Sequence, residues 1–344
     1  MSKRPLQNAA KTNQRTELIT GIDHYQRSAR NTFSACNIDR QTELRGDVTR
    51  LRTFANEQSA RFLPVHQRHC LLQAERDELL LLTHSSSDHS LCYLGLAQGQ
   101  PLFAVHLQDD KQATQLATAV AGRWVDLRTA AACVTADDAG LLAYAIAIGN
   151  WQRRHRYCGS CGSPNNIQDG GHRMRCSNAD CGQITFPRID PAMITLIEHD
   201  DAILLGRQAK WPQRRYSTLA GFVEPGESIE DAVRREVMEE AGVELDQIHY
   251  HSSQPWPFPG SLMLGFRTTA RTAELRIGNE LADARWWTLT EFEHSVRARE
   301  LLLSMPQSIA FALISDWYEE RTGRALIDLL PECKQPQQAV GATI

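Results

Sequence analysis

GFVEPGESIEDAVRREVMEEAGV, residues 221–243, carries the densest pattern of this 344-residue chain. It reads G-x5-E-x7-R-E-V-M-E-E-A-G-V, which sets glycine, glutamate and arginine at fixed spacing. Apolar residues recur there at helical period: Ile229, Ala232, Val233 and Val237. The pattern therefore predicts a helix from about Ser228 to Ala241, and Gly242 suits the left-handed residue that closes a helix.

Three glutamates share one face of the predicted helix. At about 100° per residue, Glu236, Glu239 and Glu240 fall within an arc of roughly 100°, so we expect their carboxylates to converge. Like charges at this spacing repel each other, and acids near a helix C-terminus meet the negative end of the dipole. A divalent cation with oxygen ligands removes both costs, and Mg²⁺ or Mn²⁺ suits such ligands. Taken alone, the run REVMEE also fits a solvated acidic helix face.

The whole segment resembles the Nudix box, G-x5-E-x7-R-E-U-x-E-E-x-G-U, at every specified position. This resemblance implies an α/β fold, the Nudix α/β/α sandwich, and hydrolysis of a nucleoside diphosphate linked to another moiety. It also implies that Glu236, Glu239 and Glu240 are catalytic and bind Mg²⁺ or Mn²⁺. Arg235 would orient a glutamate, and the carbonyl of Ala220 would be a further metal ligand.

The segment SQPWPFPGS, residues 253–261, indicates the substrate. Its three prolines fix backbone φ angles, while Trp256 and Phe258 offer flat surfaces to a base or a nicotinamide ring. The segment resembles a motif found downstream of the Nudix box in NADH pyrophosphatases of the NudC type. That resemblance implies a set of substrate-binding residues: Gln254, Pro255, Trp256, Pro257, Phe258, Pro259, Gly260 and Ser261. By itself, PWPFP also fits a polyproline ligand or a rigid core loop.

The same resemblance extends over about residues 136–318 and adds four residues. Glu280, in ELADARW, matches a further metal ligand of the subfamily. Phe186 matches an aromatic residue that helps to sandwich adenine, with Phe222 as the opposing ring. Ala310, in SIAFALI, matches a position whose backbone touches substrate. Ordinary core packing is the alternative for the two rings and for Ala310.

Four clustered cysteines predict a structural zinc site: Cys158, Cys161, Cys176 and Cys181. Their spacing, C-x2-C-x14-C-x4-C, is that of a zinc ribbon. The bacterial pattern ends in C-x2-C, so the longer C-x4-C of this chain does not determine the geometry of the second turn. Disulfides, free core thiols and a redox role are the alternatives. Four thiolates saturate zinc, so we interpret His155 and His172 nearby as surface residues.

Composition limits the class of protein. With 42% apolar and 23% charged residues, the chain is globular and long enough for two or three domains. A formal charge of −4 argues against non-specific adhesion to nucleic acid or to an acidic membrane surface. No apolar run reaches the roughly 18 residues that span a bilayer, and the first residues lack the apolar core of a secretion signal. We expect a cytoplasmic protein without membrane contact.

The sequence predicts five parts. A hairpin centred on Gln98-Gly99 and a helix that begins near Thr135 precede the cysteines, and a last helix begins near Pro306. The parts are a flexible tail (1–20), an N-terminal NADH-pyrophosphatase-like α+β domain (21–150), a zinc ribbon (151–190), the Nudix domain (191–328) and a polar tail (329–344).

The expected activity is metal-dependent hydrolysis of NADH, and less readily of NAD⁺, to AMP and the nicotinamide mononucleotide. The resemblance also implies removal of the NAD cap from RNA 5′ ends as a secondary activity, and a homodimer. Two alternatives stay open. One is a Nudix hydrolase of another compound such as ADP-ribose, which SQPWPFPGS argues against. The other is a nucleotide sensor without catalysis, which the intact box argues against.

Overall fold

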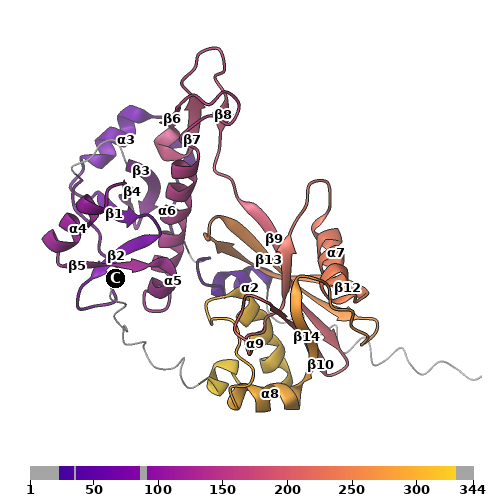
Figure 1. Cartoon of the computed structure of the whole chain (residues 1–344). Coiled ribbons are helices and arrows are strands. Elements are labelled where there is room, and N and C mark those ends of the chain that lie inside the picture. The colour runs from indigo at the N-terminus through magenta and orange to yellow at the C-terminus, as the bar shows by residue number, and fades with distance from the viewer. Residues whose placement is uncertain (1–22, 35, 86–90, 331–344) are drawn as a thin grey trace, which may run out of the picture.

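The computed structural model describes residues 23–34, 36–85 and 91–330 (Figure 1). The predicted tail at 1–20 and most of the one at 329–344 lie outside these residues. Leu329 and Leu330, at the start of the latter, pack in the core. No helix in the described part of the chain combines the length and apolar character needed to cross a membrane.

The N-terminal half is built on a five-stranded sheet with strand order β3-β4-β1-β2-β5. Its strands are β1 (Arg61–His66), β2 (His69–Gln73), β3 (Leu91–Ala97), β4 (Gln100–Leu107) and β5 (Gly122–Asp126). Its helices are α3 (Val48–Ala55), α4 (Asp110–Ala119), α5 (Leu127–Ala130) and α6 (Ala136–Arg154), with the short turn η2 (Thr42–Leu44). β3 and β4 form the predicted hairpin around Gln98-Gly99, where Ala97 pairs with Gln100.

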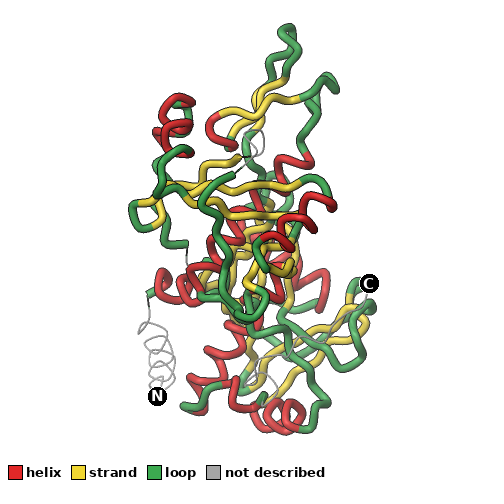
Figure 2. The backbone as a smooth tube through the Cα atoms, turned by 90° about the vertical axis from the view of Figure 1, so that its left-hand side faces the viewer, coloured by secondary structure: helices red, strands yellow, loops and turns green. Residues whose placement is uncertain are grey.

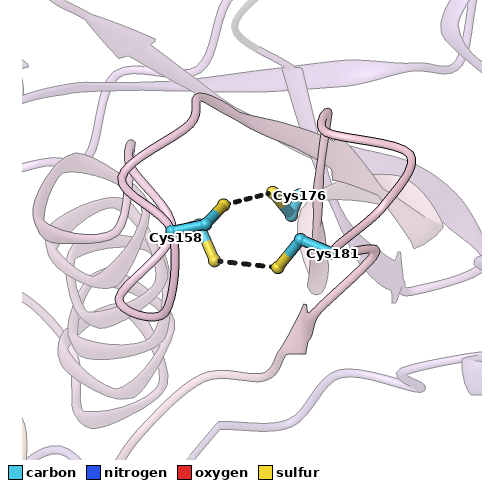
Figure 3. A group of neighbouring side chains, drawn as sticks. Cys158, Cys176 and Cys181 are labelled. Carbon is cyan, nitrogen blue, oxygen red and sulfur yellow. Dashed lines mark hydrogen bonds between the residues drawn. The ribbon is translucent and has the colours of Figure 1, made fainter.

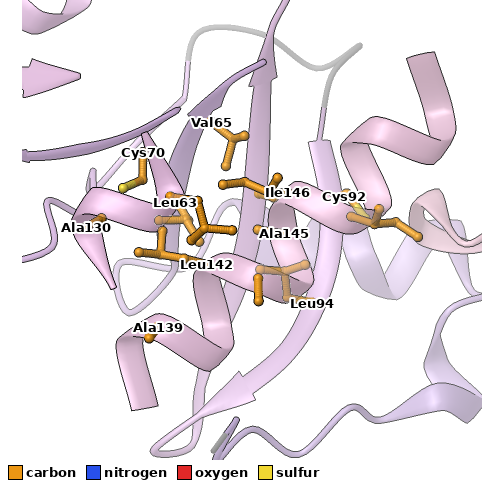
Figure 4. Packing of buried hydrophobic residues seen from close by; sticks show 14 of the residues in the cluster. Leu63, Val65, Cys70, Cys92, Leu94, Ala130, Ala139, Leu142, Ala145 and Ile146 are labelled. Atoms are coloured by element: carbon orange, nitrogen blue, oxygen red, sulfur yellow. The ribbon is translucent and has the colours of Figure 1, made fainter. Parts of the chain in front are cut away.

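Helix α6 covers one face of this sheet. It begins as predicted at Thr135, whose hydroxyl accepts a hydrogen bond from the backbone N–H of Asp138. Leu142, Ala145 and Ile146 pack on sheet residues such as Leu63 (Figure 4). The opposite side of α6 faces the C-terminal half (Figure 1).

A small three-stranded sheet follows and protrudes at one end of the molecule (Figures 1 and 2). It consists of β6 (Asn165–Gln168), β7 (Arg173–Cys176) and β8 (Ile184–Thr185), with the turn η4 (Asp169–Gly171). All four cysteines of the predicted zinc site lie in or beside these strands.

The C-terminal half contains a six-stranded sheet with order β12-β13-β9-β10-β14, and β11 pairs with β9. Its strands are β9 (Asp190–His199), β10 (Ala202–Gln208), β11 (Leu219–Phe222), β12 (Leu245–Trp256), β13 (Ser261–Ala270) and β14 (Leu281–Thr288). Its helices are α7 (Ile229–Ala241), α8 (Leu289–Arg297) and α9 (Ile309–Thr322), followed by η5 (Leu326–Leu329).

Helices cover both faces of this second sheet, because side chains of β9 alternate between two cores. Met193 and Ile197 pack with α7 on one face, whereas Ile194 and Leu196 pack with α8 and α9 on the other. The predicted α/β/α sandwich is therefore confirmed.

The first described helix, α2 (His24–Arg30), belongs spatially to the C-terminal half, since it contacts β12. The side chain of Asn31 donates to the Ser252 hydroxyl at 3.1 Å and to the Ser253 carbonyl at 2.9 Å. These long-range bonds tie the start of the described chain to the strand that leads into SQPWPFPGS.

Candidate functional site

Helix α7 presents the acidic face that the box predicts. Its N-cap is Ser228, whose hydroxyl accepts from the N–H of Asp231, and Gly242 ends the helix with φ of 68°. The predicted helix is thus confirmed at both ends. The apolar side chains of α7 pack against the sheet. The glutamates therefore lie on the side of the helix that faces β11 and the neighbouring loops.

Arg235 lies at the centre of this acidic face. Its Nη2 and Nε donate to the two carboxylate oxygens of Glu227 at 2.7 and 3.1 Å, and its Nη1 lies 3.0 Å from Glu236 Oε1. Nη1 also reaches Glu239 Oε2 at 3.3 Å, and Nη2 donates to the Phe222 carbonyl at 2.9 Å. The Arg235 guanidinium holds the pKa of Glu227 below its usual range. One planar guanidinium therefore joins α7 to β11 and to the loop that carries Glu227.

Glu240 is the buried member of the cluster. Only 3% of the residue is exposed, and its Oε2 has no hydrogen-bond partner. Burial, followed by the charges of Glu236, Glu280 and Glu239, raises the pKa of Glu240 to about 8. Burial also raises the pKa of Glu236, against the opposing effect of Arg235.

These acids fit a divalent cation. A buried carboxylate oxygen without a partner, close to three further carboxylates, is costly unless a cation neutralises it. An all-oxygen donor set is the kind that Mg²⁺ and Mn²⁺ prefer. The carboxylate oxygens lie farther apart than the thiols of the cysteine cluster. Among the described residues, only the four cysteines have ligand atoms all within 4.8 Å of one another.

Strand β11 approaches the acidic face at Gly221. A Cβ atom there would lie 2.0 Å from both Cδ and Oε1 of Glu236, so only glycine leaves room for that carboxylate. The preceding residue, Ala220, pairs with Ile194 of β9 and reaches the same region. The first glycine of the box is therefore explained by close approach rather than by a turn.

A cavity of about 220 Å³ brings together predicted residues from four elements. They are Ala220 of β11, Glu240 of α7, Gln254 and Trp256 of β12, and Ala310 of α9. These residues span some 90 positions of sequence, so the fold assembles them. The charges of Glu236, Glu280 and Glu239 help to raise the pKa of Glu240, so the three carboxylates lie near it, although Glu240 is the only one of the four in the lining of this cavity.

Gln254 is already bound to the protein. Its amide nitrogen donates to the carbonyls of Thr32 and Gln307 at 2.9 and 2.7 Å, and its carbonyl accepts from the N–H of Ile309 at 2.8 Å. The side chain therefore fixes the N-terminus of α9 and the α2 segment against the cavity wall. Its proposed contact with substrate stays a prediction.

The loop of SQPWPFPGS joins β12 to β13. Trp256 and Phe258 meet edge to face at 5.0 Å, both contact Phe33 at about 6 Å, and Arg128 lies over the Phe258 ring at 4.2 Å. Most of the motif lines a second cavity of about 430 Å³, formed in part by Pro255, Trp256, Pro257, Pro259, Gly260 and Ser261. Trp256 is shared by both cavities.

Phe186 and Phe222 are 62% and 59% exposed, so core packing does not explain either ring. Within the described part of the chain, neither ring pairs with another aromatic ring. Their predicted sandwich around adenine stays a prediction. Ala310 is buried, yet it also lines the smaller cavity.

The four cysteines converge as a zinc site requires. Their Sγ atoms lie within 4.8 Å of one another, with Cys158 and Cys181 at 3.8 Å and Cys161 and Cys176 at 3.4 Å (Figure 3). Backbone N–H groups of Ser160 and Cys161 lower the pKa of the Cys158 thiol, which favours a thiolate. Such a donor set suits a closed, structural zinc site.

The longer second knuckle closes through a local turn. The N–H groups of Cys181 and Gly182 both donate to the Asn178 carbonyl, at 3.1 and 2.9 Å, and Gly182 adopts φ of 55°. The two extra residues are thus absorbed between Ser177 and Gly182, and Cys181 still faces the other thiols.

The interpretation of His172 as a surface residue is wrong. It is buried, and its Nε2 lies 2.7 Å from the hydroxyl of Tyr144 on α6. Burial lowers the pKa of His172 to about 4, so the ring is neutral at physiological pH. The zinc ribbon packs here against the N-terminal half, a contact that local sequence does not indicate. His155 is half-buried.

Sequence reasoning also missed two residues of the acidic face. It gave Glu227 no role, although this carboxylate receives both prongs of Arg235, and it gave Gly221 no role beside Glu236. The available signal is the spacing of the box. Glu227 lies eight positions before Arg235, just ahead of the predicted helix that carries Arg235.

Comparisons with known proteins agree with this architecture. Residues 187–305 match the NUDIX domain, residues 153–186 the NADH pyrophosphatase zinc ribbon domain, and residues 59–151 the NADH pyrophosphatase-like rudimentary NUDIX domain. The chain is 40% identical over 232 residues to the NAD-capped RNA hydrolase NudC of Stutzerimonas stutzeri, covering 67% of this chain and 78% of that protein.

It is also 40% identical over 192 residues to the NAD-capped RNA hydrolase NUDT12 of Macaca fascicularis, covering 52% of this chain. The match spans 42% of that relative's length, which is less than half. The similarity to NudC covers most of both chains. The chain therefore belongs to the Nudix hydrolases, in the NADH pyrophosphatase group that carries a zinc ribbon.

Proposed function

We propose that the chain hydrolyses the diphosphate of NADH and NAD⁺ to AMP and the nicotinamide mononucleotide, with Mg²⁺ or Mn²⁺ as cofactor. One observation carries this proposal: the buried, unpartnered carboxylate oxygen of Glu240 at a cavity that also contains Ala220 and Trp256. Membership of the NADH pyrophosphatase group supports the dinucleotide substrate.

The cation ligands in this proposal are the carboxylates of Glu236, Glu239, Glu240 and Glu280 and the carbonyl of Ala220. When bound, divalent cations neutralise charge on the diphosphate and lower the pKa of water. The carboxylates are acceptors for the proton that water loses as its oxygen attacks phosphorus. The bond to the bridging oxygen then breaks, and that oxygen leaves with the other nucleotide.

Arg235 acts through the glutamates, since its donors are directed at Glu227, Glu236 and Glu239. It limits their mutual repulsion and fixes their orientation. The SQPWPFPGS loop supplies walls for a flat ring, and we assign ring recognition to Trp256, with Phe186 and Phe222 for the adenine.

Removal of NAD caps from RNA is a secondary activity in this proposal. The relatives named NAD-capped RNA hydrolases support it. We also propose a homodimer, which the exposed apolar side chains near the end of the ribbon support: Ile184, Phe186, Ile189 and Phe222. The cytoplasmic location and the five-part domain division stay predictions.

The test is incubation of the full chain with NADH, NAD⁺, ADP-ribose and NAD-capped RNA, each with and without Mg²⁺ or Mn²⁺, followed by product identification. AMP and reduced nicotinamide mononucleotide from NADH, formed only with added cation, are expected. Cleavage of ADP-ribose alone would refute the substrate assignment. Nucleotide binding without cleavage of any of the four would indicate a sensor. Glu239→Gln should abolish turnover and leave the zinc content unchanged.

A further inference from the structure

The α2 segment, residues 24–34, lies along the outer edge of the second sheet. Strand β12 is the last strand on that side, so alternate N–H and C=O groups of β12 point away from β13. At Ser253, the first residue of SQPWPFPGS, the α2 segment binds both groups. The N–H of Ser253 donates to the Ser28 hydroxyl at 3.0 Å, and its carbonyl accepts from Nδ2 of Asn31 at 2.9 Å. The edge of the sheet is therefore covered where the motif begins.

The motif needs such outside contacts because its three prolines have no backbone N–H to donate. The α2 segment supplies two more of them. The Thr32 carbonyl accepts from the amide nitrogen of Gln254 at 2.9 Å. The Phe33 ring meets those of Trp256 and Phe258 edge to face, at 6.0 and 5.9 Å. Backbone, amide and rings of the motif are thus all in contact with one short segment that lies more than 200 positions earlier in the chain.

A chain of hydrogen bonds determines how Asn31 is oriented. Its Nδ2 also donates to the Ser252 hydroxyl at 3.1 Å, and that hydroxyl lies 2.8 Å from Nδ1 of His251. The Nε2 of His251 lies 2.9 Å from the carboxylate of Asp316 on α9. Burial lowers the pKa of His251, against the opposing effect of Asp316, so the ring is neutral with its proton on Nε2. Nδ1 is then an acceptor, and the Ser252 hydroxyl donates to it.

This chain of bonds returns to the α2 segment. The Asp316 carboxylate lies 3.4 Å from Nη2 of Arg30 and 3.8 Å from Nε of Arg27. Arg27 and Asn31 are buried, with 4% and 6% of each residue exposed. The contacts of the segment with β12 and α9 therefore form one connected network.

Only an amide fits at position 31 in this network. The Ser252 hydroxyl gives its proton to His251, and the Ser253 carbonyl has none, so both partners of Asn31 can only accept. The two hydrogens of the Asn31 amide nitrogen satisfy both partners. A carboxylate of the same shape would satisfy neither, and it would place a negative charge beside two oxygen atoms.

We propose that Asn31 is a positioning residue for the hydrolysis of NADH, which acts by holding the first residues of SQPWPFPGS in place. This inference rests on the proposed function. Trp256 follows Ser253 by three residues and lines the cavity of about 220 Å³ together with Glu240. A shift of Ser253 moves the Trp256 ring, because proline stiffens the backbone between them. The bonds of Asn31 go to Ser252 and Ser253 and not to a proposed cation ligand, so its effect falls on dinucleotide binding.

The test compares two variants that make the same chemical change. Asn31→Asp replaces the Nδ2 donor by an oxygen that faces the Ser253 carbonyl. Asn37→Asp is the matched control, because Asn37 lies six positions later and is exposed. Steady-state kinetics of the full chain with NADH at saturating Mn²⁺ give kcat and KM. A Mn²⁺ titration gives the cation concentration for half-maximal activity.

Asn31→Asp should raise KM for NADH by roughly tenfold or more, the scale of a lost hydrogen bond and an unsatisfied buried group. Its kcat and its half-maximal Mn²⁺ concentration should stay close to those of the wild type, the pattern of lost substrate binding. A role limited to stability gives the opposite pattern, because a smaller folded fraction lowers kcat and leaves KM unchanged. Ser28→Ala removes one bond to Ser253 without adding charge and should raise KM about two- to fivefold.

Hydrogen exchange without substrate gives a readout that does not depend on turnover. Peptides over 252–258 should exchange faster in Asn31→Asp than in Asn37→Asp, because the motif is less firmly held. Equal KM values for these two variants would overturn the proposal, with or without faster exchange. If Asn31→Asp does not fold, an unchanged KM in Ser28→Ala overturns it. No hydrolysis of NADH by the wild type would refute the proposed function and this inference with it, so the two failures are distinguishable.

Discussion

A Cβ atom on Gly221 would lie 2.0 Å from the Cδ atom of the Glu236 carboxylate. The two residues come from β11 and α7, and their contact sets the separation between the strand that carries Ala220 and the acidic face. Any side chain at position 221 must push the carboxylate of Glu236 aside. Because that carboxylate ends a flexible side chain, the fold can tolerate the push although the site geometry changes.

Gly221→Ala should therefore reduce turnover of NADH by roughly 100-fold, the cost of misplacing a catalytic group by about 1 Å. Its melting temperature should stay close to that of the wild type. Gly46→Ala is the control, because nothing lies within 4 Å of a Cβ there. Steady-state kinetics and calorimetry of both variants check this, and full activity of Gly221→Ala would contradict the assigned role of Glu236.

Glu240→Gln should separate stability from activity. Without divalent cations, the wild type keeps a buried carboxylate beside Glu236, Glu239 and Glu280, and the neutral amide removes that repulsion. We expect the melting temperature at pH 8 to rise by at least roughly 2 °C while turnover is lost. Glu239→Gln, at a residue 61% exposed, should lose turnover with little change in melting temperature.

Adding Mn²⁺ should reverse the order of the two melting temperatures. The cation binds the folded wild type and stabilises it by mass action, whereas Glu240→Gln has lost a ligand. A Glu240→Gln variant that is less stable than the wild type without cations would show that Glu240 is not strained by its neighbours.

The sequence predicted those helices and hairpins whose ends are marked by capping or turn residues. Ser228 and Gly242 mark the limits of α7, Thr135 marks the start of α6, and Gln98-Gly99 marks the β3–β4 turn. Short-range hydrogen bonds determine each of these, so the information lies within a few residues. The cysteine spacing likewise predicted the convergence of the four thiols.

Contacts between distant segments were not predictable in this way. His172 is buried because Tyr144 and the Arg45 segment cover it, and α2 docks on β12 through Asn31. Trp256 meets Phe33, more than 200 positions earlier in the chain. Periodicity gives each segment an apolar face, but the partner of that face depends on how both halves pack. The cavity of about 430 Å³ depends wholly on such packing, because its walls come from α6 and from the turn between β12 and β13.

The zinc ribbon gives a test of metal-linked stability. Cys161→Ser should reduce bound zinc from about one ion per chain to nearly none, because a structural site needs all four thiolates. The turn from Ser177 to Gly182 then loses its anchor, and the melting temperature falls. Cys133→Ser is the matched control, since Cys133 is an exposed thiol outside the cluster. Elemental analysis and calorimetry decide the outcome, and unchanged zinc in Cys161→Ser would rule out the four-thiolate site.

His106 gives a prediction for pH dependence. The ring is buried on β4, its Nε2 donates to the Ala145 carbonyl of α6 at 2.9 Å, and its Nδ1 has no partner. Burial lowers the pKa of His106 to about 4, below the ordinary 6.5. Between these values the unfolded chain binds more protons than the folded one, so the free energy of unfolding falls as the pH drops from 6.5 to 4.

His106→Gln should remove a part of this loss, on the order of 3 kcal/mol, because each pKa unit corresponds to about 1.4 kcal/mol. The glutamine amide can still donate to Ala145, so the fold is retained at neutral pH. His172 shifts in the same direction and keeps the rest of the slope. Urea unfolding at pH 7 and pH 4.5 measures the difference, with His84→Gln, at an exposed position, as the control. If His106→Gln and wild type lose equal stability on acidification, then His106 is not the buried group that opposes protonation, and the contact of α6 with β4 is not held by a neutral imidazole.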